Sequence, residues 1–209
     1  MSGEVAFGCA ISEDRKHCAI VACGREKDGS RVVVDLVWYD HPRGAVARLT
    51  GLWERHDPVA VVVNPKSQSG TLVKPLGEAG ILVTLMTAQD VAVAHGEFLD
   101  LVNDGRLAHL DQPPLTAAVR AGQQRPLAGA QAWDPKVAVD QGPLVAATGA
   151  CWAFCRWEEL AAPGAWVVLS PRKYTGFYSS FIHRSGGPVC VFPPCSWASP
   201  WSASWPEGG

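Results

Sequence analysis

The sequence predicts a mixed α/β domain, with a five-stranded sheet of three antiparallel strands followed by parallel strands, and helices on both faces. Three observations predict it. Residues 5–39 hold three β-rich runs separated by short polar turns. The run 59–64 is almost wholly apolar, which indicates a strand buried on both faces in the middle of a mostly parallel sheet. After it, helical and strand patterns alternate, as crossover connections require.

The first three strands are expected at 5–12, 17–25 and 31–39. Their connecting turns, 12–15 and 27–30, are short and polar, which suits antiparallel hairpins. A helix is expected at about 45–55, because four large apolar side chains recur there at helical spacing. They are Val46, Leu49, Leu52 and Trp53.

Helices and strands are then expected in alternation. After the strand at 59–64 come a short helix at 70–79, a strand at 81–85, helices at 88–103 and 114–123, a loop at 125–136, and a last helix at 141–160. Thr87 is a good N-cap, Asp104-Gly105 suits a helix end, and Pro113-Pro114 suits a helix start. This order of elements fits the ribonuclease H-like arrangement.

Composition limits the possible classes of protein. With 209 residues, 47% of them hydrophobic, the chain can bury one good core. A net charge of −2 gives no global attraction to nucleic acid, so DNA binding would need a local basic patch. No apolar run is long enough for a membrane span, and the N-terminus lacks the pattern of a signal peptide, so we expect a cytoplasmic protein with reduced cysteines.

The character of the sequence changes near Pro163. Residues 163–209 are rich in Pro, Ser and Trp and show almost no periodicity. Such a segment has too few periodic apolar positions to offset the entropy of ordering. We therefore expect a folded domain at 1–162 and a disordered tail at 163–209.

One carboxylate, Asp140, directly precedes the last predicted helix. Ribonuclease H-like nucleases hold two divalent cations between carboxylates on the first strand, a middle strand and a late helix. The corresponding positions here are Ala10 (or its neighbour Cys9), Asn64 and Asp140. Asn64 offers only a neutral carbonyl oxygen, and Ala10 offers no ligand.

Four segments in this order resemble the C-terminal nuclease domain of the large terminase subunit of tailed phages, of the type found in actinobacterial phages and prophages. They are Val5-Ala-Phe-Gly with Ser12 and Asp14, Ala60-Val-Val-Val-Asn-Pro65, Leu107–Leu115, and the stretch from Asp140 to Trp152. The resemblance covers roughly residues 5–154.

The resemblance implies a nuclease that uses Mg²⁺ or Mn²⁺ to cut double-stranded DNA during packaging, in a bacterial host cell and together with other phage packaging proteins. In that family Asp stands at the positions of Ala10 and Asn64, so two of the three acids are substituted here. We therefore expect impaired or absent hydrolysis. The alternative is a non-catalytic ribonuclease H-like remnant that binds DNA or protein. These residues contain no P-loop for an ATPase motor.

Several residues have two interpretations. Asp140 is either a metal ligand or an acidic helix cap, and the two roles are compatible. Asp14 is either a substitute ligand or a solvent-facing turn residue, and His109 is either a site residue or a local hydrogen-bonding one. A basic strip is either a phosphate-binding surface or ordinary solvated surface. The nucleic-acid-binding candidates are Lys66, His109, Arg120, Arg125 and Lys136.

Overall fold

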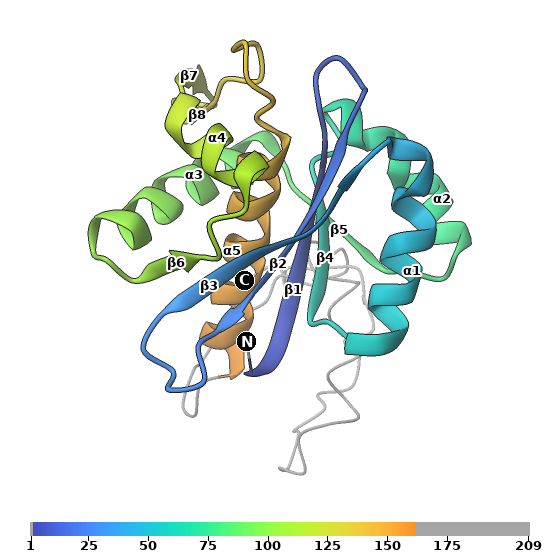
Figure 1. The fold of residues 1–209 in the computed structure, drawn as a ribbon, viewed down its shortest axis with the longest axis horizontal. Helices are drawn as coiled ribbons and strands as arrows, with labels where there is room; N and C mark the ends of the chain where they lie inside the picture. Colours follow the sequence, from blue (N-terminus) through green and yellow to red (C-terminus); the bar gives the residue numbers. More distant parts are fainter. Residues whose placement is uncertain (1, 162–209) are drawn as a thin grey trace, which may run out of the picture. The chain divides into compact units, whose positions relative to one another are not determined.

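A six-stranded mixed sheet organises residues 2–161, the part of the chain that the computed structural model describes (Figure 1). Its strands are β1 (Ser2–Ile11), β2 (Cys18–Arg25), β3 (Val32–Asp40), β4 (Ala60–Val63), β5 (Val83–Leu85) and β6 (Leu107–His109). They lie in the order β5-β4-β1-β2-β3-β6. β2 is antiparallel to β1 and β3, and the other neighbouring pairs are parallel. The predicted α/β class is confirmed, with one strand more than expected.

Helices cover both faces of the sheet, as expected. The α-helices are α1 (Ala45–His56), α2 (Val73–Glu78), α3 (Ala88–Asn103), α4 (Pro113–Ala121) and α5 (Gly142–Ala161), with 3₁₀ turns at Pro42–Gly44 and Gln68–Leu72. In Figure 1, α1 and α2 lie on one side of the sheet, and α3, α4 and α5 on the other. Within residues 2–161, no helix has the length and apolarity needed to cross a membrane. The predicted tail, 163–209, lies outside the described residues.

The sheet separates two hydrophobic cores. Side chains alternate between its faces, so Phe7, Cys9 and Ile11 pack toward α1 and α2. Ala6 and Ala10 belong to the core beneath α5 instead. The sequence left open whether Ala10 or Cys9 belongs to the site. Of the two, Ala10 lies on the α5 face and Cys9 on the face of α1 and α2.

Gly8 lets α5 lie directly on β1. A Cβ atom at Gly8 would stand 1.9 Å from the Ala146 carbonyl oxygen and 2.9 Å from the Ala150 nitrogen. Both contacts are with helix backbone, which cannot move aside as a side chain can. The helix presents small residues to this contact, since Ala146, Ala147 and Ala150 are all buried. The small residues of both elements therefore set the distance between helix and sheet.

Two predictions about the second half of the chain were wrong. The segment expected as a loop at 125–136 contains a hairpin of β7 (Gln124–Leu127) and β8 (Ala130–Trp133). Its turn places Ala128 and Gly129 at φ values of 50° and 82°, the left-handed geometry of a tight hairpin turn. β6 was also missed, and it extends the sheet by pairing with the start of β3.

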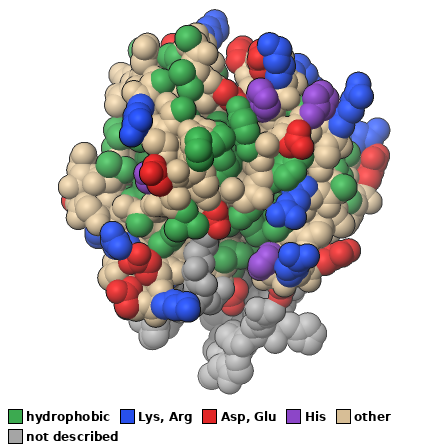
Figure 2. Space-filling view, viewed as in Figure 1, with side chains coloured by type: hydrophobic (Ala, Val, Ile, Leu, Met, Phe, Trp, Pro, Cys, Tyr) green, Lys and Arg blue, Asp and Glu red, His purple; other side chains and the backbone are tan. Residues whose placement is uncertain are grey.

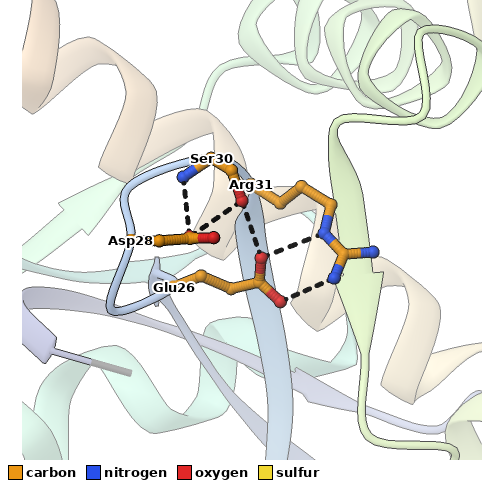
Figure 3. Close-up of polar contacts among 4 residues, drawn as sticks. All are labelled: Glu26, Asp28, Ser30 and Arg31. Atoms are coloured by element: carbon orange, nitrogen blue, oxygen red, sulfur yellow. Dashed lines mark hydrogen bonds and ion pairs between the residues drawn. The ribbon is translucent and has the colours of Figure 1, made fainter.

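The predicted turn between β2 and β3 is present and held by polar contacts (Figure 3). The Arg31 guanidinium donates to both carboxylate oxygens of Glu26, at 3.0 and 2.8 Å. The Ser30 hydroxyl lies within hydrogen-bonding distance of Glu26 and Asp28. Gly29, with a φ of 75°, supplies the left-handed residue. This network shapes the hairpin.

We expect Gly8→Ala to destabilise the fold by about 1–3 kcal/mol or more, because the helix must move away from the sheet. Urea denaturation of the variant and the parent measures the change. The matched control is Gly96→Ala on α3, where a Cβ would meet nothing within 4 Å. That substitution should be neutral or stabilise by up to about 1 kcal/mol. Equal midpoints for the Gly8 variant and the parent would show that the contact is not tight.

Candidate functional site

The C-terminal ends of β1, β3, β4, β5 and β6 point the same way and form one edge of the sheet, here called the carboxyl edge. Ala10 and Asn64 lie side by side there, because each follows one of the paired residues Cys9 and Val63. Ala10 packs in the core beneath α5, and Asn64 has the strand parity of Val62, which packs in the same core. Both positions therefore lie on the α5 side of the sheet.

Asp140 reaches this edge from the start of α5. Its Oδ1 accepts a hydrogen bond from the Gly142 backbone N–H at 2.7 Å, and its Oδ2 accepts one from the Tyr39 hydroxyl at 3.0 Å. A Cβ placed on Gly142 would lie 3.0 Å from Asp140 Oδ1 and 3.5 Å from the Ala10 carbonyl oxygen. The start of the helix thus lies beside the end of β1. Asp140 lies one residue before the N-cap position, Gln141, and accepts the N–H of the first helical residue. Its metal-ligand role stays a prediction.

Tyr39 was not singled out from the sequence. Its ring stacks on His17, with centroids 4.8 Å apart and planes 12° apart. Burial, followed by the charge of the neighbouring Asp140 carboxylate, raises the pKa of the Tyr39 hydroxyl. The hydroxyl therefore stays protonated and acts as a donor to Asp140. Only its position near the C-terminal end of β3, beside the predicted site, could have indicated it.

Asn64 uses its side chain and backbone to shape the loop after β4. Its Oδ1 accepts the backbone N–H of Lys66 at 3.0 Å, and its carbonyl oxygen accepts the Ser67 hydroxyl at 2.8 Å. The loop then turns back, and Ser69 Oγ accepts the Ile11 backbone N–H at 2.8 Å. The amide oxygen of Asn64 is thus already engaged in a local turn.

A cavity of about 720 Å³ opens at the carboxyl edge, and Ala10, Asn64 and Asp140 all line it. Three of the five predicted nucleic-acid-binding residues line the same cavity: Lys66, Arg125 and Lys136. Arg125 lies on β7, so the hairpin that the sequence did not predict forms part of the wall. Lys66 and Lys136 are exposed, and Arg125 is half-buried.

The other two predicted residues, His109 and Arg120, do not line this cavity. His109 is exposed, and its Nδ1 accepts the backbone N–H of Asp111 at 3.1 Å. That is the local role considered as the alternative for this histidine. On the face shown in Figure 2, Lys and Arg side chains are interspersed with Asp and Glu rather than gathered in one field.

Asp14 does not line the cavity either. It caps the β1–β2 turn, where it accepts the Ser12 hydroxyl at 2.7 Å and the Lys16 backbone N–H at 3.1 Å. The hydrogen bond from Ser12 is the main cause that lowers the pKa of the Asp14 carboxyl to about 2. With its side chain 52% exposed, Asp14 fits the turn role and not that of a substitute ligand.

The donor set at the carboxyl edge does not fit a pair of divalent cations. Mg²⁺ and Mn²⁺ in two-ion sites need several carboxylates to offset the loss of water. The three positions contribute one carboxylate, one amide oxygen already in a turn, and a methyl group. Among the described residues, no group of three or more His, Cys, Asp or Glu side chains is placed to hold a metal ion.

Two buried polar side chains beside the site also went unnoticed in the sequence. His95 on α3 is 3% exposed, and its ring packs edge-on against Trp133, with centroids 4.5 Å apart. Burial lowers the pKa of the His95 imidazole. Gln141, next to Asp140, is also buried, and its Nε2 donates to the Val139 carbonyl oxygen. Both residues line the cavity.

In sequence, no protein-family model matches the chain, and no curated protein matches it. In structure, its neighbours include phage large terminases and their nuclease domains. The crystal structure of the bacteriophage HK97 large terminase superposes with a TM-score of 0.58 at 17% identity, covering 73% of this chain and 40% of that protein. The large terminase nuclease of the thermophilic phage G20c gives 0.56 at 14% identity, covering 72% and 82%.

The nuclease domain of the Thermus phage P74-26 large terminase gives 0.51 at 15% identity, covering 70% and 77%. The G20c nuclease has also been solved with bound magnesium, at a TM-score of 0.54 and 14% identity, covering 70% and 79%. These likenesses confirm the predicted ribonuclease H-like fold. The chain spans 40% of the length of the HK97 protein.

We expect acid to destabilise the parent more than a His95→Gln variant. The folded protein disfavours the charged imidazole, whereas the unfolded chain protonates near the ordinary pKa of about 6.5. The stability due to neutral His95 is therefore present above that pH and is lost as the pH falls below it. Urea midpoints at pH 8 and pH 5.5 measure this. Parallel losses in both proteins would mean that His95 is protonated equally in the folded and unfolded states.

Proposed function

We propose that the chain is a terminase-type DNA endonuclease domain from a phage or prophage packaging system, with strongly impaired hydrolysis. One observation carries the proposal: the three family positions, Ala10, Asn64 and Asp140, line one cavity at the carboxyl edge, and only one of them is an acid. The likeness to terminase nucleases supports the class of the domain. The substitutions support the loss of activity.

Double-stranded DNA is the proposed partner. Lys66, Arg125 and Lys136 line the same cavity as the three family positions, where cationic side chains would meet phosphate oxygens. With an overall charge of −2, such a local group is what DNA binding requires. We place the protein in the cytoplasm of the bacterial host, together with other phage packaging proteins.

Mg²⁺ or Mn²⁺ would supply the activated water in an intact nuclease of this kind. The residues present do not provide for it. Asp140 is oriented toward the edge, but Asn64 adds no charge and Ala10 adds no ligand. The second candidate function is therefore a non-catalytic module that keeps the fold and binds DNA or protein. The presence of only one carboxylate among the three family positions favours this alternative if cleavage is absent altogether.

We expect the parent to show little or no plasmid nicking with Mg²⁺ or Mn²⁺. The double variant Ala10→Asp with Asn64→Asp should nick at least about tenfold faster, because three carboxylates can hold the ions that activate water. Three unneutralised acids repel one another, so this variant should melt below the parent without metal and recover on addition of Mn²⁺. Plasmid nicking and thermal unfolding, each with and without metal, are the measurements.

The matched control for that experiment is Ala10→Asn in the parent, which adds a similar volume without charge. It should lower stability without a response to Mn²⁺. Strong EDTA-sensitive nicking by the parent would contradict the proposed impairment. A double variant that binds no metal would show that the chain shares the fold of these nucleases but not their site.

We also expect the triple variant of Lys66, Arg125 and Lys136 to alanine to weaken duplex binding. Each lost phosphate contact should reduce the slope of log affinity against log salt by roughly 0.9. Arg120→Ala removes a cation that does not line the cavity and should leave the slope unchanged. Fluorescence anisotropy across a salt series measures both. If Arg120→Ala lowered the slope as much as each of the three substitutions does, DNA binding would depend on the overall charge and not on these three positions.

A further inference from the structure

Asp140 is held between two donors that come from distant parts of the chain. Gly142 donates its backbone N–H to Oδ1 from the first turn of α5, at 2.7 Å. Tyr39 donates its hydroxyl to Oδ2 from the end of β3, at 3.0 Å, across 101 residues of sequence. Each carboxylate oxygen thus has one donor, which leaves only a narrow range of side-chain orientations.

The Tyr39 ring is itself fixed. His17, directly before β2, stacks on it with centroids 4.8 Å apart. The ring is half-buried, and Tyr39 pairs across the sheet with Ala19. The stacked ring places its hydroxyl oxygen within hydrogen-bonding distance of Asp140, just before α5.

We propose that Tyr39 is a positioning residue for Asp140, which fixes the orientation of this carboxylate at the carboxyl edge without a cation. The proposal rests on the proposed function only in treating Asp140 as the family acid position. Hydrogen-bond partners of a ligating carboxylate set its orientation, and their removal commonly weakens a metal site by about 10–100-fold. The Tyr39 hydroxyl holds the Asp140 carboxylate in the same manner, by a hydrogen bond to one of its oxygens.

A purely structural bond between β3 and α5 would make a different prediction. It would lower global stability when broken but would leave the capping geometry of Asp140 intact. A positioning role requires that the carboxylate reorient when the hydroxyl is lost. The bond between Asp140 Oδ1 and the Gly142 N–H reports this directly, because it depends on the same carboxylate group.

The first measurement is amide hydrogen exchange by NMR on the full chain. Tyr39→Phe should speed exchange at the Gly142 amide by about tenfold, as expected for loss of a bond worth roughly 1.4 kcal/mol. The amide of Val145, which donates to the Gln141 carbonyl oxygen inside the same helix, should change little. The matched control is Thr116→Val, which removes another hydroxyl donor to a carboxylate, that of Asp111, away from the cavity. It should leave Gly142 protected.

The second measurement is Mn²⁺ affinity, followed by the loss of the free-ion EPR signal. In the Ala10→Asp, Asn64→Asp background, adding Tyr39→Phe should weaken Mn²⁺ binding by about 10–100-fold. Adding Thr116→Val should leave the Mn²⁺ affinity unchanged. Unchanged affinity together with a protected Gly142 amide in the Tyr39 variant would overturn the proposal.

The two measurements separate failure of this proposal from failure of the proposed function. If the restored background binds no Mn²⁺, the assignment of the three acid positions fails. The exchange result in the parent then decides the role of Tyr39 by itself. Loss of protection at Gly142 supports the positioning role, and retained protection rejects it.

Discussion

The distance between α5 and β1 is the constraint on which the rest of this structure depends. Gly8 has no Cβ, and the helix backbone at Ala146 occupies the space that one would take. The helix therefore lies directly on one of the central strands of the sheet, with its small residues facing inward. From that position its first residues reach the end of β1, which brings Asp140 beside Ala10. A larger residue at Gly8 would move the whole helix and with it the acid.

The sequence predicted most of this arrangement because hydrophobic periodicity records burial. The apolar run ending at Asn64 indicated a strand buried on both faces, and it is β4. The capped segment after Thr87 is α3, with Thr87 and Asp90 forming a reciprocal capping box. Sheet alternation then places Ala10 and Asn64 on one face. The relation of these two positions to Asp140 follows from strand order and helix placement, which the topology rules restrict to few choices.

The elements that the sequence did not predict show no hydrophobic periodicity typical of a strand. β6 is three residues long at the edge of the sheet, too short to show alternation. β7 contains Pro126, which argues against a strand, and its turn has Ala128 where Asn or Asp would have indicated a hairpin. The contacts of Tyr39 and His95 were hidden for another reason. They join residues far apart in sequence, and no local pattern indicates which strand end a tyrosine will share with a helix start.

The charge of Asp140 at the carboxyl edge is met by hydrogen bonds. Three acids in this place would repel one another unless a cation lay between them. Here Asp140 stands alone among the three positions, and two donors meet its charge. Hydrogen bonds to a charged group contribute about 1.5–3 kcal/mol each, enough to hold one carboxylate at a partly buried position. The two hydrogen bonds therefore hold this carboxylate without a cation. The cavity is thus present with only one acid among the three positions, and Lys66, Arg125 and Lys136 line it.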